Sequence, residues 1–109
     1  MDQPLLVYST FPDMASAERA GRELVARKLA ACVNLVPGMH SIYAWKGGVE
    51  EAREVVAIVK TRQGRAEEVR AHLRTIHPYE TPIILMIPVS GGDPATLAWL
   101  MGETAANAP

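Results

Sequence analysis

The chain has 109 residues, of which 49% are hydrophobic and 21% charged, and its net charge is −1. This length suits one domain, and the composition is that of an ordinary globular protein. A charge near zero gives no electrostatic attraction to nucleic acid or to an anionic membrane, and the apolar runs are too short to span a bilayer.

The single cysteine, Cys32, cannot form an internal disulfide. Residues 1–4 also lack the basic start and apolar core of a signal peptide. We therefore expect a cytoplasmic protein, since thiols stay reduced there. Cys32 follows two alanines and precedes a valine, so we expect it in the core rather than in a reactive site.

The first half of the chain predicts a strand, a helix and a second strand. Residues 5–11 are apolar strand formers, and Asp13 can cap the helix that follows. Apolar residues then recur at helical spacing from Met14 to Leu29. Residues 31–36 predict the second strand, which is broken at Pro37-Gly38 and resumes over 41–45.

A hairpin follows, with Gly47-Gly48 as its expected two-residue turn and a long return strand over 50–61. The pairs that this turn predicts are Lys46 with Val49, Trp45 with Glu50, Tyr43 with Ala52, and Ser41 with Glu54. One face of the hairpin then alternates aromatic rings with carboxylates. A lone hairpin of this kind is barely stable in water, so we expect its rings to be covered by another subunit.

The second half predicts a helix after Gln63-Gly64, ended by Pro78, and a strand over 83–89. Asp93-Pro94 begins a short last helix, and residues 104–109 are expected to form a frayed tail. The order βαββαβ plus a terminal helix predicts an α+β, ferredoxin-like fold in one domain over 1–109.

His77, Tyr79 and Glu80 lie in a segment that contains Pro78 and Pro82. A residue before proline is held extended, so this segment is stiff and presents its side chains at low entropic cost. One interpretation is a ligand or metal site with His77 and Glu80 as metal ligands. The other is a rigid connector whose polar groups satisfy the backbone. One histidine beside one glutamate is a weak metal signal, so the residues alone leave both open.

Three other polar residues are candidates for a site. Lys60 closes an apolar strand, where its charge could lie in a cleft or reach water. His72 falls on the polar side of the second predicted helix, and we expect it to be solvated. His40 follows the break at residues 37–38 and could be a ligand only beside another donor. Since no nucleophile, base and orienting group line up, we expect no enzyme.

Several motifs spread through most of the chain carry a family resemblance. They are residues 28–38 (KLAACVNLVPG), 41–47 (SIYAWKG), 60–62 (KTR), 77–82 (HPYETP), 99–100 (WL) and the single residue Glu54. In these motifs the chain resembles the CutA family, named for divalent-cation tolerance. The resemblance implies a ferredoxin-like subunit in a homotrimer, with hairpin strands that cross between subunits. This architecture is similar to that of the nitrogen regulatory PII signalling proteins.

The resemblance also implies a function in divalent-cation tolerance, with copper or another divalent ion as partner and no organic cofactor. Some family members have a cysteine on the first strand and two consecutive histidines before the proline; here Ser9 and Ile76 stand there, with His77 retained. Copper(I) favours sulfur ligands, so divalent copper or zinc at His77 and Glu80 is the remaining metal mode.

We expect this site in a cleft between subunits. Its predicted lining is Tyr79, Glu54, Tyr43, Trp45 and Lys60 of a neighbouring subunit. An alternative function is a PII-like trimeric sensor that binds a small anion or metabolite in the same cleft. A third is a passive trimeric scaffold with an indirect effect on metal tolerance.

Overall fold

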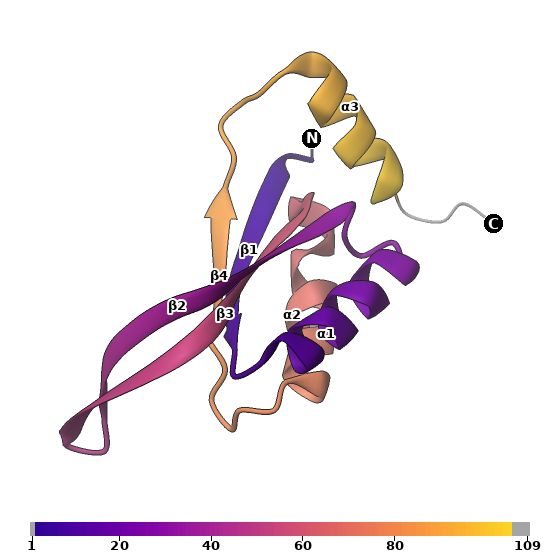
Figure 1. Cartoon of the computed structure of the whole chain (residues 1–109). Helices are drawn as coiled ribbons and strands as arrows, with labels where there is room; N and C mark the ends of the chain where they lie inside the picture. The colour runs from indigo at the N-terminus through magenta and orange to yellow at the C-terminus, as the bar shows by residue number, and fades with distance from the viewer. Residues whose placement is uncertain (1, 106–109) are drawn as a thin grey trace.

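The computed structural model describes residues 2–105 (Figure 1). Its elements are β1 (Pro4–Phe11), α1 (Met14–Ala26), β2 (Cys32–Trp45), β3 (Gly48–Arg62), a 3-10 turn (Gln63–Arg65), α2 (Ala66–Ile76), β4 (Ile84–Pro88) and α3 (Pro94–Glu103). The predicted order is confirmed. The predicted break in the second strand is wrong, because β2 runs on past Pro37-Gly38 through a bulge between Val36 and Met39.

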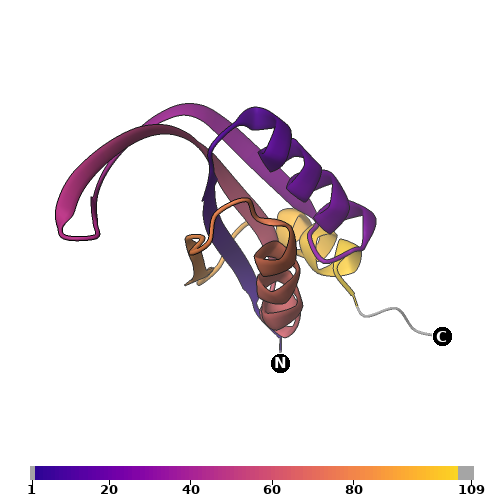
Figure 2. The same ribbon diagram turned by 90° about the horizontal axis from the view of Figure 1, so that it is seen from below.

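The four strands form one antiparallel sheet in the order β2-β3-β1-β4. With three helices this makes the α+β fold that the sequence predicts, in the split βαβ arrangement. Helices α1 and α2 lie along one face of the sheet, and α3 contacts the ends of β1 and β3 (Figures 1 and 2). No helix among residues 2–105 has the length and apolar content needed to cross a membrane.

The core lies between the sheet and the two long helices. Alternate residues of β1 point into it, including Leu5, Val7 and Phe11, as the period of a strand requires. Leu24 of α1 and Leu73 of α2 meet them from the helix layer. On the opposite face, no helix within residues 2–105 covers the sheet over most of its length.

Side chains and a proline fix the helix ends. The Asp13 carboxylate accepts the Ser16 backbone N–H at 2.8 Å, which begins α1, and Asp93 accepts the backbone N–H groups of Ala95 and Thr96 before α3. Helix α2 ends at Ile76, and His77 is extended (φ −73°, ψ 135°) because Pro78 follows it. This geometry places His77, Tyr79 and Glu80 in the connector to β4.

The hairpin turn differs by one residue from the prediction. Lys46 (φ 48°) and Gly47 (φ 81°) occupy the turn, and Trp45 pairs with Gly48. The pairs predicted from a turn at Gly47-Gly48 are therefore wrong. The observed pairs include Tyr43 with Glu50, Ser41 with Ala52, and Met39 with Glu54. Each partner moves by two residues, so every side chain keeps the face predicted for it.

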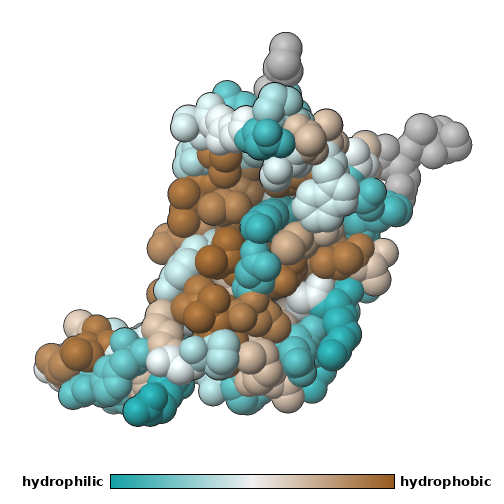
Figure 3. Space-filling view, turned by 45° about the horizontal axis from the view of Figure 1, so that its top comes forward, coloured by the Kyte–Doolittle hydropathy of each residue, from teal (hydrophilic) through white to brown (hydrophobic). Residues whose placement is uncertain are grey.

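Large apolar side chains are exposed on the face of the sheet that the helices leave open. Leu85 is 57% exposed and Ile87 is 44% exposed on β4, and Val36 is half exposed on β2. The hairpin projects from the body, so the molecule measures 47 × 27 × 22 Å. Figure 3 shows hydrophobic surface on the body and at the tip of this hairpin. Exposed apolar side chains that gather on one face are typical of surfaces that bind another protein.

The end of α3 is anchored rather than frayed at Thr104. Thr104 is fully buried, its hydroxyl donates to the Leu100 carbonyl at 2.8 Å, and the same oxygen accepts from Arg62 Nε at 3.0 Å. Arg62 also donates to the Met101 carbonyl and to the Asp2 carboxylate. The prediction of a frayed tail is therefore wrong at Thr104, and residues 106–109 lie outside the described part of the chain.

Candidate functional site

A cleft of about 650 Å³ opens between the projecting hairpin and the connector that follows α2. We call it the hairpin cleft. The structure brings five of the predicted site residues together in its lining: Tyr43, Trp45, Glu54, Tyr79 and Glu80. Strands β2 and β3 supply the first three, and the connector supplies the last two. The stiff connector therefore faces the hairpin within one subunit.

Tyr79 and Glu54 are joined across the cleft. The Tyr79 hydroxyl donates to Glu54 Oε2 at 2.7 Å. Burial raises the pKa of the Tyr79 phenol well above its usual range, and the hydrogen bond to Glu54 and the charge of this carboxylate raise it further. Tyr79 therefore stays a neutral donor, and Glu54 remains an acceptor fixed at the cleft wall.

His77 lies behind the cleft, with both ring nitrogens engaged. Nε2 is 2.8 Å from the Thr10 carbonyl oxygen, and Nδ1 is 3.1 Å from the Tyr79 backbone nitrogen. Because a carbonyl only accepts and an amide N–H only donates, Nε2 carries the proton and Nδ1 is bare. His77 is 8% exposed, and its ring stacks on Phe11 with centroids 4.2 Å apart. A metal at His77 would have to displace one of these two hydrogen bonds.

The local environment also sets the charge of His77. Burial lowers its pKa, while the hydrogen bond to the Thr10 carbonyl and the nearby charge of Glu54 oppose the change without reversing it. The ring is therefore neutral at pH 7. These contacts match the connector interpretation, since His77 ties the exit of α2 to the end of β1.

The two carboxylates of the cleft are its charged groups. Glu54 is half-buried and Glu80 is exposed, and none of the described residues that line the cleft is basic. Within residues 2–105, no three His, Cys, Asp or Glu side chains converge as a ready metal site. One subunit therefore contributes two carboxylates to the lining, and carboxylate oxygens are ligands for divalent cations.

Lys60 does not lie in the hairpin cleft of its own subunit. It pairs with Leu6 and Cys32 near the other end of β3. From Glu54 to Lys60 is six residue steps, roughly 20 Å along a strand. The prediction that a neighbouring subunit's Lys60 reaches the cleft stays a prediction.

Two expectations for single residues are wrong. Cys32 is half-buried and shares the open face of the sheet with its partner Lys60, outside the core cluster. Its neighbour Val33 takes the core side instead. His72 is largely covered, with a side chain that is 12% exposed and Nε2 3.2 Å from Glu23 Oε1. It therefore lies between α1 and α2 rather than in solvent.

His40 lies beside a second possible ligand, as its candidacy for a metal site required. Its Nε2 lies 2.7 Å from Glu51 Oε1, and both side chains are more than half exposed. Their register places them on the face of the hairpin opposite Tyr43 and Trp45. This pair is a solvated surface contact, separate from the cleft.

Sequence reasoning missed the residues that form the floor of the cleft. Tyr8 and Thr10 of β1 line it, and so does Met39, whose sulfur accepts from the Tyr8 hydroxyl at 3.4 Å. The alternation of β1 could have identified Tyr8 and Thr10 as residues outside the core, because they occupy the positions between core residues. These positions face the hairpin because of the strand order of the sheet, which was not predicted from the sequence.

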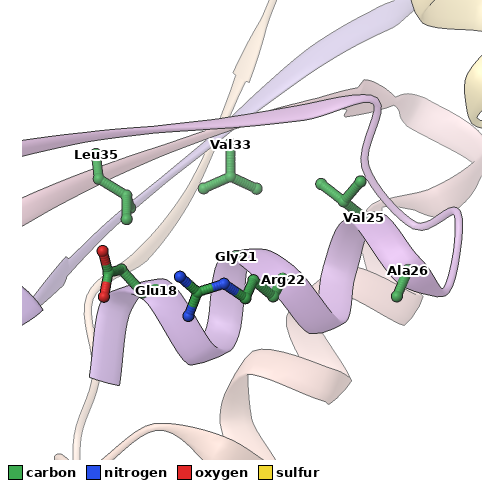
Figure 4. Close-up of a pocket in the computed structure, with 7 residues that line it drawn as sticks. All are labelled: Glu18, Gly21, Arg22, Val25, Ala26, Val33 and Leu35. Carbon is green, nitrogen blue, oxygen red and sulfur yellow. The ribbon is translucent and has the colours of Figure 1, made fainter. Parts of the chain in front are cut away.

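A second hollow of about 480 Å³ lies between α1 and β2 (Figure 4). Its lining is mainly apolar, with Val25, Val33 and Leu35. Gly21 lets the helix approach the strand, since a Cβ at this position would lie 3.4 Å from the Val33 side chain. Glu18 and Arg22 are its charged residues and they come from the same helix. It lacks polar groups that converge from several elements, so the hairpin cleft is the candidate site.

Known proteins match this chain over nearly its whole length. The family model described as "CutA1 divalent ion tolerance protein" matches residues 5–103. A "Divalent-cation tolerance protein CutA" of Pectobacterium atrosepticum is 42% identical over 103 residues, which cover 91% of this chain and 94% of that protein.

Solved structures match the fold as well. The crystal structure of CutA1 from Oryza sativa has a TM-score of 0.92 at 34% identity and covers 96% of both chains. The structure titled periplasmic divalent cation tolerance protein CutA from Archaeoglobus fulgidus has a TM-score of 0.90 at 39% identity, covering 93% of this chain and 98% of that one. From the matched residues and the shared fold, this chain belongs to the CutA1 divalent ion tolerance protein family.

Proposed function

We propose that the chain is a homotrimeric divalent-cation tolerance protein, which binds copper or another divalent ion in the hairpin cleft and contributes to metal-ion homeostasis. One observation carries the proposal: Glu54 and Glu80 line a cleft that has no basic residue in its described lining. The family membership and the names of the relatives support a role in divalent-cation tolerance as well.

The open sheet face supports the trimer. Ile83, Leu85 and Ile87 form an exposed apolar stretch, and Tyr43 and Trp45 are 39% and 41% exposed on the hairpin. Burying such side chains is favourable by about 25 cal/mol per Å², so a second and third copy would stabilise the fold. A neighbour would also bring further ligands to a cleft that has two carboxylates of its own.

Light scattering on the full chain tests the assembly. The parent should have three times the mass of one chain, and Leu85→Glu or Trp45→Ala should weaken that assembly because each removes apolar contact. Val25→Glu is the matched control, since Val25 is 43% exposed on α1, away from the open face. A monomeric parent at micromolar concentration would overturn the trimer.

The metal proposal assigns Glu54 and Glu80 as ligands and gives His77 a positioning role. His77 holds the connector against β1 through the Thr10 carbonyl, which keeps Tyr79 and Glu80 at the cleft. Calorimetric titration with Cu²⁺ and Zn²⁺ tests the assignment. Glu54→Gln and Glu80→Gln should each weaken binding, because they remove charge and keep shape.

His40→Gln is the control for this titration, because the exposed His40–Glu51 pair could bind copper adventitiously. Unchanged affinity in the two cleft variants, with loss in His40→Gln, would move the metal to the outer face of the hairpin. A larger loss of metal affinity in His77→Asn than in Glu54→Gln would indicate that His77 is itself a ligand.

The volume of the cleft favours a second candidate, a PII-like trimeric sensor that binds a small molecule. A volume of about 650 Å³ lies within the range of small-molecule sites. The negative charges of the two carboxylates would repel an anion, which was one of the ligands expected under this alternative. A binding role is proposed over a catalytic one, since the raised pKa of Tyr79 makes it a poor proton donor at neutral pH.

We propose a cytoplasmic location from the single cysteine, which offers no internal disulfide. The relative from Archaeoglobus fulgidus is titled periplasmic, so the location needs a direct test. Fractionation of cells that express the untagged chain should recover it with cytoplasmic markers. Recovery in an osmotic-shock fraction would overturn the proposal.

A further inference from the structure

We infer that Glu23 of α1 and His72 of α2 form a clasp between the two helices, which tightens when the His72 ring takes up a proton. The inference goes beyond the proposed function, since it concerns the helix layer rather than the hairpin cleft. Helices α1 and α2 lie on the face of the sheet opposite its open face (Figure 1). Neither metal binding in the cleft nor assembly through the open face therefore covers the pair.

The His72 ring lies between the helices with one nitrogen inside. Its side chain is 12% exposed, and Nε2 lies 3.2 Å from Glu23 Oε1. Nε2 itself is buried and makes no aligned hydrogen bond with any residue that the structure describes. The Glu23 side chain is 36% exposed, so it is free to change its rotamer and turn toward the ring. The two groups are therefore close enough for an ion pair but lack the alignment of a hydrogen bond.

Protonation of the ring changes what Nε2 can do. A neutral imidazole has one N–H group and one bare nitrogen, whereas the imidazolium has an N–H group at both nitrogens. A bare Nε2 facing a carboxylate oxygen leaves two acceptors without a donor, and a neutral ring with its proton on Nε2 donates without a charge. The imidazolium supplies both the proton and the charge, so the contact with Glu23 becomes a charge-assisted hydrogen bond. The contact is therefore strongest when the ring is protonated.

The other charged groups near the clasp are exposed or already paired. Glu68 lies one turn before the ring on α2, and Arg65 of the 3-10 turn binds its carboxylate at 2.9 Å. Arg19 and Arg27 lie one turn on either side of the α1 carboxylate, and both are exposed. The strands beneath the two helices contribute mainly apolar side chains. The surrounding charges thus act through solvent and with opposite signs, so the direct contact decides how the ring responds to protonation.

The clasp acts in the direction opposite to His77. Acid weakens the contacts of His77, because its Nδ1 accepts from the Tyr79 backbone N–H only while it is bare. A ring that gains a partner on protonation instead stabilises the folded protein at acidic pH, and this contribution is lost as the pH rises. The chain neighbours of the clasp residues, Leu24 and Leu73, belong to the core. Helices α1 and α2 therefore stay docked at a pH that loosens the exit of α2.

A double-variant cycle at pH 5.5 and pH 7.5 tests the clasp on the full chain, because histidine changes its charge within this range. The parent, Glu23→Gln, His72→Gln and the double variant are unfolded in urea at one protein concentration, since the unfolding of an oligomer depends on it. The contribution of His77 cancels in the cycle. The coupling should change the apparent unfolding constant about two- to fivefold at pH 5.5 and less at pH 7.5. Equal coupling at both pH values, or none at pH 5.5, would overturn the inference.

Two further variants identify the group that titrates. His72→Lys keeps a positive charge at both pH values, so the loss of stability caused by Glu23→Gln should not depend on pH in this background. A loss that varies with pH there would assign the titration to another group, and the inference would fail. Glu68→Gln is the matched control, since its partner Arg65 stays charged and its effect should be the same at both pH values. A control that varied with pH as Glu23→Gln does would overturn the inference as well.

Discussion

The hydroxyl of Tyr79 lies 2.7 Å from Glu54 Oε2, and this bond joins the connector after α2 to the middle of β3. It closes one side of the hairpin cleft with two residues that are 25 positions apart in the chain. The bond fixes Glu54 and stiffens the connector at the same time.

Tyr79→Phe should lower the free energy of unfolding by about 1 to 2 kcal/mol, because a partly buried hydrogen bond to a charged acceptor is lost. Urea unfolding of this variant, of Glu54→Gln and of the double variant gives the coupling between the two residues. If the two single effects simply add, Tyr79 and Glu54 are not coupled and the bond contributes nothing of its own.

The stability of the protein should depend on His77 below neutral pH. Burial lowers the pKa of the native ring, so the unfolded chain, with a histidine pKa of about 6.5, binds more protons in the window just below that value. The contribution of His77 is therefore fully present above about pH 6.5 and is lost as the pH falls through the native pKa.

Urea midpoints at pH 7.5 and pH 5.5 measure this dependence. The loss on acidification should be smaller in His77→Asn than in the parent, since each unit between the native and unfolded pKa is worth about 1.4 kcal/mol. His40→Gln is the control, because that ring is exposed. An equal loss in His77→Asn and the parent would contradict the assigned role.

Arg62→Gln should destabilise the protein by about 1 to 3 kcal/mol, because the variant leaves the Met101 carbonyl and the Thr104 hydroxyl without their charged donor. Limited proteolysis should then cut α3 earlier than in the parent. Arg70→Gln is the matched control, since its pair with Glu67 is exposed and should contribute less than about 0.5 kcal/mol. A melting temperature equal to that of the control would rule out the anchoring role.

The hairpin turn should be sensitive to the residue at position 46. Lys46 has a positive φ of 48°, which asparagine adopts readily and a β-branched residue does not. Lys46→Val should therefore cost about 1 kcal/mol, while Lys46→Asn should keep at least the stability of the parent. Thermal melts of the two variants check the turn, and the reverse order would favour a turn at Gly47-Gly48.

The order of the elements could be predicted because strand and helix periods are local properties of the sequence. The turn was missed by one residue, since Gly47-Gly48 is the better glycine pair and yet Lys46 takes the left-handed position. The face of each hairpin side chain was still correct, because the error moved every partner by two residues.

The candidate site was less predictable, because its contacts join distant residues. The partner of His77 is the Thr10 carbonyl, 67 positions away, and no local pattern indicates that contact. Cys32 was assigned to the core because its neighbours are apolar, while the alternation of β2 gives the core side to Val33. The pattern of α2 alone predicts a solvated His72, although Glu23 of α1 covers this side chain.

Arg62 donates hydrogen bonds to both Asp2 and Thr104, so the two ends of the described chain lie at one corner of the molecule. From Glu54 to Arg62 is eight residue steps along β3, roughly 26 Å. A fusion partner or surface tether attached at either terminus would thus stand at the opposite end of β3 from the hairpin cleft. Protein immobilised through either end should therefore keep its hairpin cleft open to ligands.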